Sequence, residues 1–129
     1  MENRIGFGSY FAHSCADVAP HAAVGDGCLL GMVTLGERAL IGARVQILSG
    51  SRQHARDSEG KLTLEGHFDM VHIGADSWIG AGAVVMADVG QRTTVAAGSV
   101  IFRKVPDDVA VAGNPARVID ERKDERKPA

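Results

Sequence analysis

Three histidines lie in or beside one long polar segment, and they are the side chains best suited to proton chemistry. His54 and His67 fall within residues 48–71, and His72 follows directly. Imidazole changes its protonation state near neutral pH, so histidine is a common general base in enzymes. His67 and His72 are also five residues apart, a spacing that metal-binding pairs can have. Proton transfer and metal binding are therefore both candidate roles for this segment.

Composition and charge exclude several classes of protein. Fourteen Lys and Arg against 16 Asp and Glu leave no basic excess for a phosphate backbone, which argues against nucleic-acid binding. No apolar run is long enough to enter a membrane, and Met1 is not followed by an apolar signal core. Cys15 and Cys28 form no C-x-x-C motif, so reduced thiols are expected. We therefore expect a soluble cytoplasmic protein.

A six-residue repeat determines where the candidate side chains are placed. Branched aliphatic residues recur every six positions, and glycine often follows them. This period fits neither a helix nor a long strand, so it predicts short strands joined by turns around a narrow core. We expect the glycines to occupy turn positions that need permissive backbone angles. A narrow core of this kind agrees with 16 glycines and an aromatic content of only 5%. The aliphatic positions are Val18, Val24, Leu35, Ile41, Ile47, Ile73, Ile79, Val85, Val89, Val95 and Ile101.

The repeat loses its phase at two places. Val24 and Leu35 are one residue too close for two hexads, and Val85 and Val89 are two residues too close for one. We expect a shortened turn at each place. A β-sandwich is the alternative fold, but its turn signals would recur about every 8–12 residues. The sequence therefore favours an all-β fold of stacked hexapeptide coils.

The chain is expected to form one domain over residues 1–129, with two departures from the repeat. The repeat is suspended at about 48–71, and loops this long in a compact repeat are usually functional. A tolerated insertion at a corner of the coil is the plainer alternative. From about 105 to 129 the chain changes character and ends in two copies of Asp-Glu-Arg-Lys. We expect this part to form a cap, a polar tail or a short solvated helix.

Residues 71–119 carry three blocks in order: IGADSWIGAGAVV, VAAGSV and VAGNPARVI. The chain thereby resembles the hexapeptide-repeat acyltransferases, most closely the galactoside, maltose and polysaccharide O-acetyltransferases. The resemblance implies a left-handed parallel β-helix, a homotrimer with active sites between subunits, and acetyl-CoA as co-substrate without a metal. It also implies direct transfer of an acetyl group to a hydroxyl of a sugar or polysaccharide precursor, with histidine as general base. An amino sugar as acceptor, giving N-acetylation, stays open.

The resemblance indicates His54 as the general base. Family members carry the catalytic histidine soon after a Ser/Thr-Gly pair, and here Ser49-Gly50 precedes His54. Galactoside-type enzymes have histidine directly after the glycine, where this chain has Ser51. Asp57 is the candidate partner that orients the His54 ring, and His72 is the second candidate base.

Five residues match positions at which the family contacts coenzyme A. In the family, an aromatic residue before Ile-Gly lies near the cleft, and small residues let backbone amides approach the pantetheine arm. Basic residues contact the nucleotide end. Phe102 stands where the family commonly has threonine, so that hydrogen bond is not expected. The matching residues are Trp78, Ala81, Ala97, Arg103 and Arg117.

Two other classes of function compete with the acyltransferase interpretation. The stretch PHAAVGDGCLLGM resembles the γ-class carbonic anhydrases, which bind zinc through three histidines. Only His21 has a matching context, and His67 and His72 lie in the wrong part of the repeat. A non-catalytic β-helix scaffold is the third class. The long polar loop and the C-terminal blocks count against it.

Overall fold

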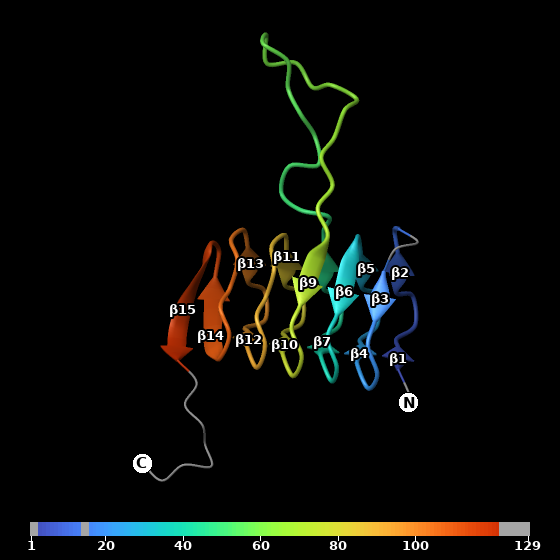
Figure 1. Cartoon of the computed structure of the whole chain (residues 1–129), viewed down its shortest axis with the longest axis vertical. Coiled ribbons are helices and arrows are strands. Elements are labelled where there is room, and N and C mark those ends of the chain that lie inside the picture. Colours follow the sequence, from blue (N-terminus) through green and yellow to red (C-terminus); the bar gives the residue numbers. More distant parts are fainter. Residues whose placement is uncertain (1–2, 14–15, 122–129) are drawn as a thin grey trace.

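The computed structural model describes residues 3–13 and 16–121, which wind into a three-sided prism of short strands (Figure 1). The chain runs from face 1 to face 2 to face 3 and then begins the next coil on face 1. Strands of successive coils pair in parallel, and the fold is the expected left-handed β-helix. Face 1 contains β1 (Arg4–Ile5), β4 (Ala23–Val24), β7 (Leu40–Ile41), β10 (Trp78–Ile79), β12 (Thr94–Val95), β14 (Val109–Gly113) and β15 (Ala116–Glu121). Face 2 contains β2 (Tyr10–Phe11), β5 (Leu29–Leu30), β8 (Gln46–Ile47), β11 (Val84–Val85) and β13 (Val100–Ile101), and face 3 contains β3 (Asp17–Val18), β6 (Val33–Leu35) and β9 (Val71–Ile73).

The lengths of the coils follow the phase shifts of the repeat. In the later coils face 3 is reduced to single bridges, in which Val89 pairs with Ile73 and with Val105. Because Val89 follows Val85 so closely, the turn between them is short, as the sequence predicted. The other shortened turn lies between β5 and β6, within the predicted interval. The inward aliphatic residues therefore stay in register from coil to coil.

The core is a column of small and branched aliphatic side chains. Most strands turn one such residue inward, and β6, β9 and β14 turn two. These residues stack on their counterparts in the coils above and below. Burying a Val, Leu or Ile side chain contributes about 1.5–3 kcal/mol, so the stack supplies most of the driving force for folding. The largest fully buried residues are Leu30, Leu35, Ile47, Ile73, Ile79, Ile101, Val33, Val45, Val71, Val85, Val95 and Thr93.

The glycines of the repeat are required for a different physical reason from the one expected. The glycines that directly follow the repeat's aliphatic residues do not have positive φ, so the expectation of permissive backbone angles is wrong for them. They are needed because the next coil approaches closely. A Cβ on Gly42 would lie 2.7 Å from the amide nitrogen of Ala81 and 2.9 Å from the carbonyl oxygen of Ile79. Positive φ occurs two residues later in the hexad, at glycines such as Gly82 or at charged residues such as Arg38.

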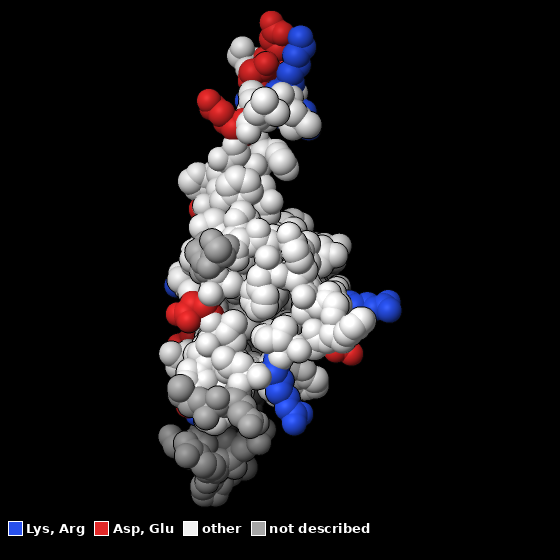
Figure 2. Space-filling model, turned by 90° about the vertical axis from the view of Figure 1, so that its right-hand side faces the viewer, with Lys and Arg blue, Asp and Glu red and all other residues white. Residues whose placement is uncertain are grey.

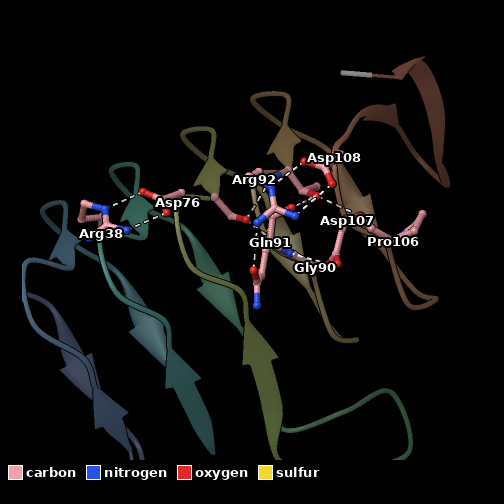
Figure 3. A network of polar contacts seen from close by, with 10 residues as sticks. Arg38, Asp76, Gly90, Gln91, Arg92, Pro106, Asp107 and Asp108 are labelled. Carbon is pink, nitrogen blue, oxygen red and sulfur yellow. Dashed lines mark hydrogen bonds and ion pairs between the residues drawn. The ribbon is translucent and has the colours of Figure 1, made fainter. Parts of the chain in front are cut away.

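Charged side chains of alternating sign follow the corner between face 3 and face 1 (Figure 3). The guanidinium of Arg38 donates to both carboxylate oxygens of Asp76, at 2.7 and 2.9 Å, and Arg92 does the same to Asp108, at 2.6 and 3.0 Å. The hydrogen bond from Arg38 lowers the pKa of Asp76, and the same bond raises the pKa of Arg38. All four residues have positive φ, so one turn position repeated in successive coils brings them together.

The long loop leaves the prism at the corner between faces 2 and 3, between β8 and β9, and projects away from the coils (Figure 1). Its outer part is a small hairpin in which Arg56 bridges to Leu62. Acidic and basic side chains gather at its far end (Figure 2). Leu64, close to this hairpin, is fully exposed.

The last coil ends in an antiparallel hairpin of β14 and β15. This hairpin, with a cis peptide bond before Pro115, forms the cap expected at the C-terminal end. The repeated Asp-Glu-Arg-Lys motif begins within β15, so its first residues are in a strand and not in the helix considered above. Its continuation over 122–127 lies outside the described residues. The described part of the chain contains no helix of the length and apolarity needed to cross a membrane.

Candidate functional site

The two ends of the loop lie side by side and form the loop base, residues 49–53 and 66–69. The amide nitrogen of Asp69 donates to the carbonyl oxygen of Ser49 at 2.9 Å. Ser49 is only 2% exposed, although it lies at the start of the loop. The loop base is therefore attached to the packed coils, unlike the hairpin further out.

A histidine and a carboxylate pair at this base. His67 Nε2 lies 2.8 Å from Asp69 Oδ1, and the two side chains are 64% and 44% exposed. A carboxylate beside one ring nitrogen favours a proton on that nitrogen and leaves the other nitrogen with its lone pair. The pair is therefore open to solvent and can accept a proton from an incoming group.

His54 and Asp57 are not brought together. His54 follows the loop base and is exposed, and within the described residues no hydrogen bond or ion pair joins it to Asp57. The Asp57 carboxylate accepts hydrogen bonds from the backbone of Glu59 at 2.9 Å and of Lys61 at 3.0 Å. Asp57 thus closes the turn of the hairpin, and nothing in this geometry supports its expected role as the partner of His54.

His72 lies on face 3, between Thr34 of the preceding coil and Asp88 of the next. Its Nδ1 is 2.5 Å from Thr34 Oγ1, and its backbone nitrogen donates to Asp88 Oδ1 at 2.8 Å. Nε2 of the ring is the nitrogen left for another partner. Within residues 3–13 and 16–121, no three His, Cys, Asp or Glu side chains are grouped as they would be to hold a metal ion.

Trp78, Ala81 and Ala97 lie around face 1 and its corner with face 2. The Trp78 side chain points outward between Leu40 and Thr94 and is 57% exposed. Ala81 and Ala97 occupy the same corner position in neighbouring coils, and the Gly98 amide between them donates to the Ala81 carbonyl at 2.9 Å. These three residues form an exposed strip that a ligand could follow along the prism.

Arg103 and Arg117 meet in a pocket of about 420 Å³ at the C-terminal end of the prism. Lys104 lines it as well, so three cations surround it and no acidic residue is among those that line it. Its floor is apolar, formed partly by the last coil and partly by the cap. The lining residues are Ile101, Phe102, Arg103, Lys104, Val105, Pro106, Val111, Pro115, Ala116, Arg117 and Val118.

One side of this basic pocket lies at the corner of the prism that also carries the loop base. The loop leaves after β8, and Phe102–Lys104 follow β13, two strands further along face 2. Neighbouring strands are about 4.8 Å apart, so the two corner segments are separated by roughly 10 Å along the prism. Trp78, Ala81 and Ala97 do not line the pocket; they lie on face 1 and at its corner with face 2.

Sequence reasoning missed three of the residues that shape these sites. Lys104 could have been found from the sequence, because it is a second cation directly after Arg103. No sequence feature indicates Asp69 or Thr34. Asp69 contacts His67 because the loop bends back at its base, and Thr34 contacts His72 because two strands far apart in the sequence are paired.

Comparison with known proteins agrees with this fold and its repeat. Residues 70–103 match the family model described as "Hexapeptide repeat of succinyl-transferase". A maltose O-acetyltransferase from Clostridium difficile 630 superposes with a TM-score of 0.84 at 20% identity, covering 95% of this chain and 68% of that one. That likeness establishes the fold.

Two further proteins are similar in sequence as well. A hexapeptide-repeat acetyltransferase from Vibrio cholerae, solved with acetyl coenzyme A, is 27% identical with a TM-score of 0.76, over 92% of this chain and 70% of that one. Serine acetyltransferase 4 of Arabidopsis thaliana is 38% identical over 108 residues, which are 80% of this chain and 29% of that protein. The chain thus spans less than a third of the length of this curated relative.

Fold, repeat and comparisons define one class: a left-handed β-helix built from hexapeptide repeats. The chain is thus built from hexapeptide repeats, and the three proteins named above, to which it is similar in sequence or structure, are acetyltransferases.

Proposed function

We propose that the protein is an acetyl-CoA-dependent O-acetyltransferase that acts on a hydroxyl of a sugar or polysaccharide precursor. The observation that carries the proposal is a basic, apolar-floored pocket of which one side, Phe102–Lys104, lies at the same corner as a histidine-bearing loop base. Coenzyme A has anionic phosphates at one end and a reactive thioester at the other. The cations of the pocket can bind the phosphates, and a loop histidine can act as the base in the reaction at the thioester.

The reaction needs only a base and hydrogen-bond donors. A histidine of the loop accepts the proton of the acceptor hydroxyl while its oxygen forms a bond to the thioester carbonyl carbon. Backbone N–H groups stabilise the tetrahedral oxyanion, and the carbon–sulfur bond then breaks as the histidine returns the proton to the leaving sulfur. The family resemblance indicates His54 as the candidate base, with His72 second. Acetyl passes directly between the two bound substrates.

The cofactor contacts divide into two groups. Arg103, Arg117 and the newly found Lys104 face the phosphates, and Trp78 with the Ala81 and Ala97 corner lines the path of the pantetheine arm. Because Arg103 and Lys104 lie on the other side of face 2 from Trp78, Ala81 and Ala97, we propose a homotrimer in which neighbouring subunits complete each site. A cytoplasmic location belongs to the same proposal.

The proposal is tested first by binding and then by transfer. Acetyl-CoA at millimolar concentration should raise the thermal midpoint, since a ligand that binds only the folded state stabilises it. An unchanged midpoint would favour a non-catalytic scaffold. Thiol release with hydroxylated sugars and with amino sugars then identifies the acceptor class, and transfer to amino sugars alone would make the protein an N-acetyltransferase.

The residue test uses His54→Ala. If His54 is the base, this variant lowers turnover by roughly 10²–10⁴-fold without a change in CoA binding. Unchanged turnover in this variant would move the role to another loop histidine. Glu59→Gln, at the end of the hairpin, is the matched control for a substitution in the loop.

A further inference from the structure

The loop base holds His67 more firmly than any other described histidine of the loop. Its ring pairs with Asp69 at 2.8 Å, and its backbone nitrogen donates to the carbonyl oxygen of Arg52 at 3.2 Å. Both its backbone and its side chain are therefore fixed. His54, by contrast, has no described side-chain partner, and nothing orients its ring.

Asp69 is itself fixed from two sides. Its backbone is bound to Ser49, and Ser49 Oγ accepts a hydrogen bond from the amide of Met32 in the preceding coil at 2.9 Å. Its carboxylate lies against Gly50, where a Cβ would be 2.7 Å from Asp69 Oδ2 and 3.1 Å from its Cβ. Gly50 has φ +87°, a conformation that favours glycine, so the chain supplies both the backbone shape and the space that the carboxylate needs.

This geometry determines which nitrogen of His67 can act. With Nε2–H donating to Asp69, the lone pair is on Nδ1, and the exposed ring leaves that nitrogen accessible. An oriented imidazole backed by a carboxylate is the arrangement that general bases use, because the carboxylate holds the tautomer and stabilises the imidazolium that forms. His72 differs, because its Nδ1 is already engaged by Thr34.

We propose that His67 is the general base of the loop and that Asp69, seated on Gly50, is its positioning residue; this rests on the acetyl-transfer function proposed above. The acceptor hydroxyl gives its proton to Nδ1 of His67 as its oxygen bonds to the thioester carbon. When the carbon–sulfur bond breaks, Nδ1 returns that proton to the thiolate. Asp69 touches neither substrate and acts through His67.

The positioning role is tested without any substrate. Nitrogen-15 NMR of the histidine rings, at a pH where they are neutral, reports which ring nitrogen carries the proton. We expect His67 to show a single tautomer with Nε2 protonated, and we expect Asp69→Ala and Gly50→Ala to convert it to a mixture of both. Assignment comes from His67→Ala, and Glu59→Gln is the control. A tautomer mixture in the wild type, or no change in Asp69→Ala, would overturn the role of Asp69.

The catalytic role is tested by a double-mutant cycle in the acetyl-transfer assay. We expect His67→Ala to lower kcat by roughly 10²–10⁴-fold with little change in KM for acetyl-CoA. Asp69→Ala should lower kcat in the wild type and have no further effect in the His67→Ala background, since it acts through that ring. Equal losses in both backgrounds, or full turnover in His67→Ala beside a large loss in His54→Ala, would refute the assignment. A wild type that transfers acetyl to no acceptor refutes the proposed function, while the NMR result still decides whether Asp69 positions His67.

Discussion

Replacing Arg117 with alanine removes one of the three cations around the C-terminal pocket. Within the described residues none of Arg103, Lys104 and Arg117 has an ion-pair partner, and no acidic residue lines the pocket. Within that part of the chain their charges are not neutralised, so they are available to a phosphate. A hydrogen bond assisted by charge contributes about 1.5–3 kcal/mol. The Kd for coenzyme A should therefore rise by about 10- to 150-fold in Arg117→Ala.

The measurement is isothermal titration calorimetry with coenzyme A at two salt concentrations. The wild type should bind more weakly at high salt because exposed charges are screened, and Arg117→Ala should lose less affinity between the two conditions. Arg56→Ala is the matched control, since Arg56 is an exposed arginine that donates to the Gly60 carbonyl in the loop hairpin at 2.8 Å. The reasoning is refuted if Arg117→Ala binds as tightly as the wild type, or if Arg56→Ala weakens binding equally.

Two further predictions concern the prism itself. Gly42→Ala should lower the free energy of unfolding by about 1–3 kcal/mol, because the new methyl group meets backbone atoms of Ala81 that cannot turn away. Gly98→Asn, at a position with φ +72° and open space, should cost much less, and chemical denaturation of both variants would contradict us if their order were reversed. Because Arg38 lowers the pKa of Asp76, that carboxylate stabilises the fold above the ordinary aspartate pKa and loses its contribution as the pH falls through the lowered value. Below about pH 4, thermal midpoints should therefore fall more steeply for the wild type than for Asp76→Asn, and parallel curves would count against this.

The stacked coils could be predicted because the six-residue repeat is visible in the spacing of residues close together in the sequence. Each inward aliphatic residue is specified by its distance from the previous one, so even the short turn between Val85 and Val89 was visible as a change of phase. The positions of the repeat glycines were predicted correctly, but the reason expected for them, permissive backbone angles, was wrong. Gly42 is required because the backbone of the next coil approaches it at Ile79 and Ala81, and one sequence does not show how close two coils come.

The candidate site was predicted less completely, because it depends on contacts between residues far apart in the chain. The resemblance selected Arg103 and Arg117, and the structure places both at one pocket. It paired His54 with Asp57 by proximity in sequence, whereas the Asp57 carboxylate binds the backbone of its own turn. The carboxylate that does meet a loop histidine is Asp69, and this becomes visible only when the two ends of the loop are seen side by side.

The attachment of the loop has a consequence for engineering. β7 pairs with β10 in the same parallel register as the other coils, although the whole loop lies between them in sequence. The pairing of these strands therefore does not depend on the length of the loop between β8 and β9, and the entropic cost of closing a longer loop grows only slowly. Residues 54–65 could be exchanged for a graft of different length and chemistry while Ser49 and Asp69 keep the junction closed. The chemistry of the loop could then be changed at one junction, independently of the coils that carry the basic pocket.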